Sequence, residues 1–245
     1  MPNYTNNYIT ITCNTEAEAV QIKEFIAGND TPFDFNKLIP MPESLNMTSG
    51  SEEDDAIAAY LNRYPELVED EKIIKLILEK SRIVPFAPKD RLKWINDEKR
   101  LAELVDLGRK YVNNYIKYGA TTWYEWCITH WGTKWNACHA DVSRYKNELH
   151  IDFDTAWSYP EPVVTKLSKL FPTASMHMRA IEETLRFAFE WDIKNGVVTR
   201  EEDITDEIRK EWGWEADDER GEETDDELRE ATDDEWGEAT DDEWF

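Results

Sequence analysis

Stretches in which apolar and polar residues alternate recur along this chain, and their order limits the folds that it can adopt. Residues 8–13 alternate with a period of two, and the same period returns in residues 135–145 and 147–157. This period predicts strands with one buried face each. Apolar residues at helical spacing fill residues 15–28 and 158–171. The order strand, helix, strand, strand, helix and further strands predicts an α+β fold with a ferredoxin-like split βαβ sheet.

Capping residues mark the expected ends of these helices. Thr15 and Glu18 form a capping box, and Gly28 suits the left-handed residue that often follows a helix. Ser158 is expected to cap the second helix. Beyond Gly119 the pattern changes back towards a period of two.

Residues 51–118 also have helical spacing and interrupt the ferredoxin-like order, so we expect a helical insertion there. The sequence therefore predicts four parts. They are the first βα half (residues 1–50), the helical insertion (51–120), the second half of the ferredoxin-like domain (121–200) and an acidic C-terminal tail (201–245).

The acidic residues are concentrated in that tail. The chain has 53 Asp and Glu against 28 Lys and Arg, a formal net charge of −25. Residues 201–245 hold 23 of the acidic and 4 of the basic residues, a net charge of −19, which leaves only −6 on the first 200 residues. Such asymmetry is typical of a segment that mediates an interaction.

The tail repeats the triplet Asp-Asp-Glu every eight residues, and tryptophan follows the last two copies. A period of eight drifts by about 80° per repeat at 3.6 residues per turn, which excludes a coiled coil. Because its like charges repel one another, we expect the tail to be disordered when free, or a fluctuating helix.

The density of carboxylates in the tail indicates what it binds. As a helix, the tail would carry one acidic residue per ~3 Å, close to the ~3.4 Å spacing of phosphates along one DNA strand. Tryptophans would add the hot-spot contacts that charge alone lacks. We therefore expect the tail to occupy the basic nucleic-acid-binding site of a partner protein, with a merely solubilising tail as the alternative. The expected contact residues are Trp212, Trp214, Asp225, Asp226, Glu227, Asp233, Asp234, Glu235, Trp236, Asp241, Asp242, Glu243 and Trp244.

Three stretches resemble the YubB-like family of phage and conjugative-plasmid proteins. They are FNKLIPMP at 35–42, WCITHWGTKWNAC at 126–138 and FDTAWSYPEPVVTKLSKLFP at 153–172. The resemblance implies a ferredoxin-like domain in a mobile-element protein, and it carries over no biochemical activity. Because it places the protein among phage and plasmid accessory proteins, the resemblance implies that the partner is a host defence nuclease or a CRISPR effector. Together with the carboxylate density of the tail, this predicts an anti-defence or anti-CRISPR DNA mimic.

A second hypothesis places a ligand site in the segment Trp-Gly-Thr-Lys-Trp. A lysine among aromatic rings can hold a phosphate or a stacked base. The ligand or nucleic acid would contact Trp131, Lys134, Trp135 and Trp157, and the tail would regulate access to them. The alternative is that these tryptophans pack in the core while Lys134 extends over them.

The same segment contains residue types that bind zinc, but at an unsuitable spacing. Cys127, His130, Cys138 and His139 are the right ligand types. If residues 135–144 form a strand, Cys138 and His139 point to opposite faces, so we expect no metal.

Motifs of the common enzyme classes are absent from the sequence. It has no G-x-S-x-G, P-loop, G-x-G-x-x-G or H-E-x-x-H, and Asp152 and Asp154 form only a common pair on one strand. We expect no catalysis and no cofactor. The negative charge disfavours direct binding of nucleic acid. No basic segment followed by an apolar one opens the chain, and no apolar run could span a bilayer, so we expect a cytoplasmic protein with reduced thiols.

Overall fold

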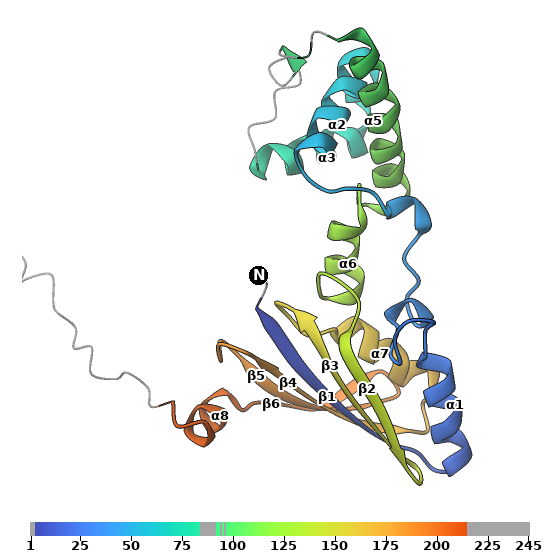
Figure 1. Cartoon of the computed structure of the whole chain (residues 1–245), viewed down its shortest axis with the longest axis vertical. Helices are drawn as coiled ribbons and strands as arrows, with labels where there is room; N and C mark the ends of the chain where they lie inside the picture. Colours follow the sequence, from blue (N-terminus) through green and yellow to red (C-terminus); the bar gives the residue numbers. More distant parts are fainter. Residues whose placement is uncertain (1–2, 84–91, 94, 96, 215–245) are drawn as a thin grey trace, which may run out of the picture. The chain divides into compact units, whose positions relative to one another are not determined.

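The computed structural model describes residues 3–83, 92–93, 95 and 97–214. It combines helices with one antiparallel six-stranded sheet, which confirms the predicted α+β class (Figure 1). The chain divides into two compact units, residues 1–205 and 206–245. The strands are β1 (Tyr4–Thr12), β2 (Cys138–Tyr145), β3 (Glu148–Ala156), β4 (Ser175–Glu182), β5 (Ala188–Lys194) and β6 (Val197–Asp203). The helices are α1 (Glu16–Ile26), α2 (Ser51–Arg63), α3 (Glu71–Ile83), α5 (Glu98–Tyr118), α6 (Trp123–Trp131), α7 (Glu161–Leu170) and, where the second unit begins, α8 (Thr205–Glu211).

The strand order of the sheet is that of a ferredoxin-like domain with an added hairpin. The order is β2-β3-β1-β4-β5-β6, and every neighbouring pair is antiparallel. β1 and β2 therefore run in the same direction with β3 between them, which is the split βαβ arrangement. The hairpin of β5 and β6 extends the sheet beyond β4.

The alternation predicted from sequence places one face of the sheet in the main core. Ile9 and Ile11 of β1 are buried, and the facing residues of β3, Leu149 and Ile151, are buried with them. The same cluster contains Ile22 of α1 and apolar residues of α7. Each such side chain contributes roughly 1.5–3 kcal/mol on burial, so the alternation largely determines which face the helices cover.

The N-terminal cap of α1 is confirmed, and two other expectations about helix ends are wrong. Thr15 Oγ1 accepts a hydrogen bond from the backbone N–H of Glu18. Gly28, however, has no left-handed backbone; it is needed because a Cβ there would lie 2.7 Å from Cβ of Asp34. Ser158 does not cap α7, since Pro160 occupies the N-cap and the Ser158 hydroxyl instead donates to the carbonyl of Gly132.

Helices α2, α3 and α5 enclose a hydrophobic cluster of their own. Residues such as Ile57, Ile73 and Tyr111 are buried in it. The helices α2 and α5 approach closely at Gly108, where a Cβ would lie 1.9 Å from the carbonyl oxygen of Ala56. No side chain larger than hydrogen fits at this contact.

A buried carboxylate connects this helical cluster to α6. Glu53 of α2 is 1% exposed and accepts hydrogen bonds from the ammonium of Lys80 on α3 and from Thr121, the latter at 2.5 Å. Lys80 also lies 3.6 Å from Glu125 of α6. Burial disfavours the charged form of Lys80, but the attraction of Glu53 and the neighbouring carboxylates outweighs it and raises the pKa of Lys80.

The segment after Gly119 is helical, which corrects the expected return to a period of two. Thr122 caps α6 by accepting from the backbone N–H of Tyr124, and α6 contributes Trp126 and Trp131 to the main core. The two buried tryptophans, Trp126 and Trp131, lie five residues apart in a helix of nine residues, which has too few turns to establish a helical period. Among the described residues, no helix combines the length and the apolar character needed to cross a membrane.

Candidate ligand-binding site around Lys134

A glycine begins the loop that positions Lys134. Gly132 ends α6 with a left-handed φ of 79°, and a Cβ there would lie 2.9 Å from Cδ of Pro162. Both the backbone angle and the close approach of α7 therefore require glycine. The chain turns sharply at this point and runs along the end of β3.

Thr133 fixes the first half of the loop to β3. Its buried hydroxyl donates to the carbonyl of Ala156 at 2.9 Å and lies 3.2 Å from the N–H of the same residue, which donates to it. Ser158, which follows β3, holds Gly132 from the same side. Residues 132–133 are thus held against the end of β3 by hydrogen bonds to both backbone groups of Ala156.

Asn136 fixes the second half of the loop. Its Nδ2 donates to Asp34 at 2.7 Å, and its Oδ1 accepts from the backbone N–H of Phe35 at 2.9 Å. Lys134 and Trp135 lie between the two anchors and are only partly buried. The loop therefore presents one cation and one indole from a fixed backbone.

Three aromatic rings surround the ammonium of Lys134. Its Nζ lies 4.5 Å from the ring centroid of Trp157, 5.1 Å from that of Trp135 and 5.5 Å from that of Tyr124. These distances are within the range of cation–π attraction. Tyr124, on the first turn of α6, is a member of this cluster that the sequence did not indicate, because the helix that carries it was not predicted.

Trp157 has a strained backbone. Its φ is 71°, and its N–H donates to the carbonyl of Asn3 at 2.9 Å. A bulky residue in the left-handed region costs on the order of 1–3 kcal/mol and is a common mark of a functional site. The Trp157 side chain is 45% exposed, so a large part of its surface remains accessible.

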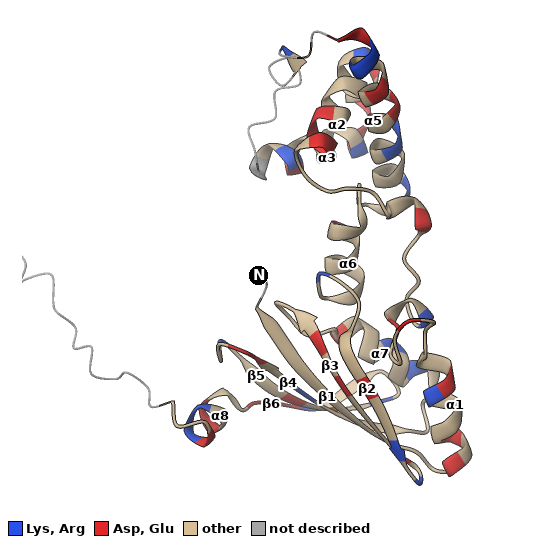
Figure 2. Ribbon diagram, viewed as in Figure 1, with Lys and Arg blue, Asp and Glu red and all other residues tan. Residues whose placement is uncertain are grey.

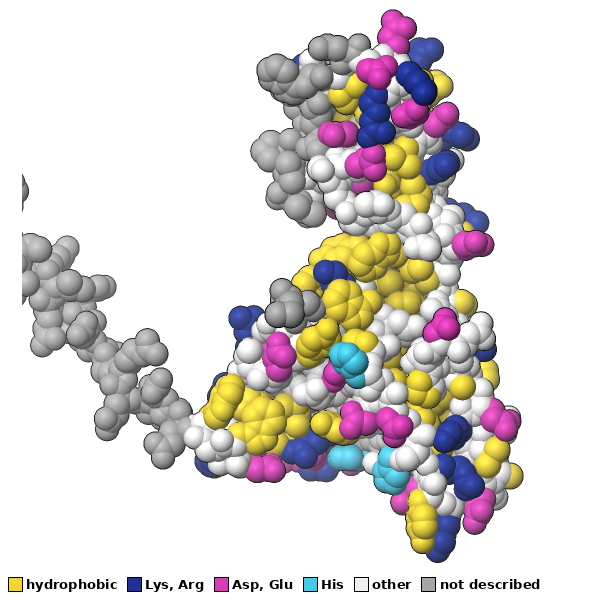
Figure 3. Space-filling view, in the orientation of Figure 1, with side chains coloured by type: hydrophobic (Ala, Val, Ile, Leu, Met, Phe, Trp, Pro, Cys, Tyr) yellow, Lys and Arg dark blue, Asp and Glu magenta, His cyan; other side chains and the backbone are white. Residues whose placement is uncertain are grey.

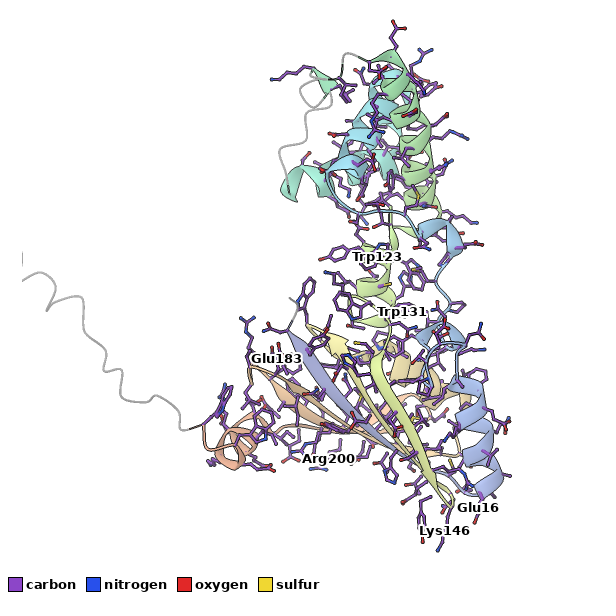
Figure 4. The ribbon with its side chains drawn as sticks, viewed as in Figure 1. Glu16, Trp123, Trp131, Lys146, Glu183 and Arg200 are labelled. Atoms are coloured by element: carbon purple, nitrogen blue, oxygen red, sulfur yellow. The ribbon has the colours of Figure 1, made fainter. Side chains whose placement is uncertain are left out.

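Trp131 lies apart from the Lys134 cluster, although the sequence grouped them. It is 3% exposed, its indole N–H donates to the carbonyl of Ile39 at 2.9 Å, and its ring meets that of Phe35 edge to face. Figure 4 labels Trp123 and Trp131 at the two ends of α6. Hydrophobic side chains gather over this part of the molecule in Figure 3. Of the ligand-site residues predicted from sequence, the structure brings together Lys134, Trp135 and Trp157.

The first pair of zinc-ligand types lies in α6. Cys127 is buried with its thiol 3.8 Å from the sulfur of Met41, and burial raises the pKa of this thiol to about 12. The His130 ring stacks on Trp126 with 4.3 Å between centroids, and its Nδ1 lies 2.9 Å from the carbonyl of Trp126. A thiol that resists deprotonation is a poor metal ligand.

The second pair lies at the start of β2, and both residues contact Asp154 of β3. The Cys138 thiol donates to its carbonyl at 3.3 Å, and His139 Nδ1 lies 2.8 Å from its carboxylate. Within residues 3–83, 92–93, 95 and 97–214, no three His, Cys, Asp or Glu side chains are grouped so that they could hold a metal ion.

The sheet face opposite the main core carries charged side chains and histidines; Figure 2 colours the charged residues along the strands, and Figure 3 shows acidic side chains and histidines near one another. Asp141, Asp152, Tyr8, Arg179 and Glu190 occupy successive positions across five strands. Arg179 pairs with Glu190 at 3.6 Å, whereas the two aspartates face each other. Partial burial raises the pKa of Asp152, and the charges of Asp154 and Asp141 raise it further.

The C-terminal candidates are described only in part. Trp212 and Trp214 are 45% and 48% exposed, and their rings lie 6.2 Å apart at 74°. They follow α8, where Gly213 has a left-handed φ of 70°. The other predicted contact residues lie outside the described residues: Asp225, Asp226, Glu227, Asp233, Asp234, Glu235, Trp236, Asp241, Asp242, Glu243 and Trp244.

The sequence and the fold of the chain can be compared with those of known proteins. Residues 130–241 match the family model of the ferredoxin-like domain in Api92-like protein. A comparison with curated proteins gives no match. Among solved structures, the chain is similar to a crystal structure of protein api92 from Yersinia pseudotuberculosis, with 14% sequence identity and a TM-score of 0.41, over 83% of this chain and 98% of that chain. The ferredoxin-like domain expected from the sequence is confirmed, while the assignment to the YubB-like family stays a prediction.

Proposed function

We propose that this protein acts by binding and not by catalysis, through the acidic, tryptophan-bearing C-terminal region. In this proposal the region occupies the basic nucleic-acid-binding site of a partner protein. The finer form of the proposal follows the resemblance to the YubB-like family. It makes the protein an accessory protein of a phage or plasmid that acts in the host cytoplasm on a defence nuclease or CRISPR effector.

The observation that carries the proposal is the separation of charge along the chain. Residues 201–245 hold a net charge of −19 and the preceding 200 residues only −6. A high density of one charge sign accelerates association with a partner of the opposite sign and excludes partners of the same sign.

The exposed tryptophans supply the second element of recognition. Trp212 and Trp214 each leave nearly half of their surface accessible at the start of this acidic unit. Tryptophan is enriched among the residues that dominate binding energy, because a large ring buries much apolar area at low entropic cost. Exposed indoles reduce solubility, so a purely solubilising tail would not favour them.

The charges of the sheet are a weaker candidate for the same role. Several of its carboxylates already have partners: Asp192 lies 2.9 Å from the His177 ring and 3.8 Å from the Arg200 guanidinium, and Glu190 pairs with Arg179. Paired charges attract a basic partner less than unpaired ones. We therefore assign the contact to the Asp-Asp-Glu triplets and their tryptophans.

Affinity capture from a host lysate with the full-length chain tests this proposal. A matched variant carries the nine triplet residues from Asp225 to Glu243 as Asn or Gln, and a second carries Trp236→Ala and Trp244→Ala. We expect the unaltered chain to retain a nucleic-acid-handling protein at low salt and to release it at high salt. Both variants should retain less of it. Equal retention by the neutralised variant, or retention in high salt, would contradict the proposal.

A further inference from the structure

Lys134 is a cation without an anionic partner in a strongly acidic protein. The chain has 53 acidic residues, yet among the residues that the structure describes no carboxylate pairs with the Lys134 ammonium and no oxygen accepts from it. By contrast, Lys80, which is also partly buried, contacts three carboxylates. The three N–H donors of Lys134 are therefore available to a ligand.

The rings around Lys134 determine which kind of ligand fits. The ammonium already lies over the faces of Trp157, Trp135 and Tyr124, so a cationic ligand would meet a like charge there. An anionic group would instead accept from the ammonium. The half-exposed indole of Trp157 offers a face on which a planar ring can stack.

The backbone of the site is fixed before any ligand binds. Thr133 and Asn136 anchor the loop on both sides of Lys134, and the hydrogen bond from Trp157 to Asn3 holds the strained residue that carries the exposed ring. A site built on an anchored backbone loses little entropy on binding.

We propose that Lys134 and Trp157 bind a nucleotide, with the phosphate on the ammonium and the base stacked on the indole. Trp135 and Tyr124 position the ammonium. This site is independent of the proposed function of the C-terminal region, because it uses a positive charge on the ferredoxin-like domain. The negative charge of the chain disfavours a long phosphate backbone more strongly than a single nucleotide, so the free nucleotide is the ligand.

Titration of the full-length chain with adenosine 5′-monophosphate, followed by calorimetry and ligand-observed NMR, tests the site. Adenosine and inorganic phosphate are the two matched probes, and a single-stranded DNA of ten nucleotides is the third. We expect the monophosphate to bind at least about tenfold more tightly than adenosine or phosphate. If adenosine bound as tightly as the monophosphate, the role of Lys134 would be overturned. If inorganic phosphate bound as tightly, the role of Trp157 would be overturned. Tighter binding of the DNA would overturn the choice of a free nucleotide as the ligand.

Lys134→Gln should weaken binding of the monophosphate at least about tenfold and leave the affinity for adenosine unchanged. Lys146→Gln is the matched control, because Lys146 also lies over one ring, that of Tyr145 at 5.2 Å, and is exposed on the same domain. Trp157→Asn removes the ring, and asparagine tolerates the left-handed backbone, so the fold is kept. Undiminished affinity in both Lys134→Gln and Trp157→Asn would refute the proposal.

Discussion

The Lys134 cluster and the C-terminal unit both place an indole after a helix that ends in a left-handed glycine, but they differ in charge and in how they are held. Gly132 follows α6 with φ 79°, and Gly213 follows α8 with φ 70°. In the first region a single ammonium is surrounded by rings on a loop anchored by buried hydrogen bonds. In the second, exposed rings precede a run of carboxylates.

Aromatic side chains alone therefore do not identify a ligand. In the two proposals, the charge beside the rings selects the sign of the ligand, which is an anion at Lys134 and a basic surface at the C-terminal region. The packing around them sets how specific the contact is, because an anchored backbone fixes geometry whereas a run of charges does not.

The largest expected effect is the loss of stability on replacing Gly132, compared with replacing Gly213. Gly132→Ala should lower the free energy of unfolding by roughly 2–3 kcal/mol, because it adds a strained backbone angle and a Cβ 2.9 Å from Pro162. Gly213→Ala adds the same kind of strain, but no atom lies within 4 Å of its Cβ. Thermal unfolding followed by circular dichroism should show a larger loss of Tm for Gly132→Ala than for Gly213→Ala. An equal loss of Tm in both would show that backbone strain, and not the packed loop, determines the difference.

The next effect tests the anchor of the Lys134 loop. Thr133→Val keeps the side-chain shape but leaves the buried N–H and C=O of Ala156 without their partner, which costs on the order of 2 kcal/mol. Chemical denaturation measures this loss. Thr129→Val, on the exposed face of α6, is the matched control and should change the free energy of unfolding by less than about 0.5 kcal/mol. A Thr133 variant as stable as the control would mean that the loop is not held by this hydroxyl.

The sheet and its main helices could be predicted from sequence, because the alternating residues of β1 and β3 are also the residues that face each other in the core. Period and burial agree there. α6 was missed because its buried residues Trp126, Cys127 and Trp131 fall within one nine-residue helix, which is too short for a period to stand out.

The candidate site was predictable only where neighbours in sequence are neighbours in space. Lys134 and Trp135 are adjacent, and Trp157 was grouped with them on the strength of an expected strand pairing. The turn at Gly132, between the helix and the loop, brings Tyr124 into the Lys134 cluster. The same turn leaves Trp131 outside the cluster. Ser158 looked like a helix cap, but the close packing of its segment against Gly132 gives it a different partner.

The two regions should differ in how strongly salt weakens their binding. Raising NaCl from about 50 to about 300 mM should weaken binding of the C-terminal region to its partner by roughly tenfold or more, since many exposed charges contribute and each is screened. The affinity for the monophosphate at Lys134 should change by less than about threefold, because only one partly buried ammonium contacts it. Calorimetry at the two salt concentrations measures both. A larger salt effect on the monophosphate than on the partner would reverse the comparison.

The smallest expected effect concerns repulsion within the folded unit. The folded protein raises the pKa of Asp152 through partial burial and the charges of Asp154 and Asp141, so the folded state binds protons more readily than the unfolded chain near that pKa. Stability contributed by this residue therefore falls as pH rises through its titration range. Asp152→Asn should stabilise by about 0.5 kcal/mol at pH 7 and by nothing well below the carboxylate range.

Denaturation at pH 7 and pH 3 checks this sign. Asp192→Asn is the control of opposite sign, because Asp192 has His177 and Arg200 as partners and its loss should destabilise at pH 7. Stabilisation by Asp152→Asn at both pH values would show that its effect is not electrostatic.

Competition for the captured partner tests whether the C-terminal region occupies the partner's nucleic-acid-binding site. The measurement is the release of a labelled nucleic acid from that partner as the full-length chain is added, by fluorescence anisotropy. The account predicts one-for-one displacement by the unaltered chain and none by the chain whose Asp-Asp-Glu triplets are neutralised. A partner that holds the nucleic acid and this protein at the same time would contradict it.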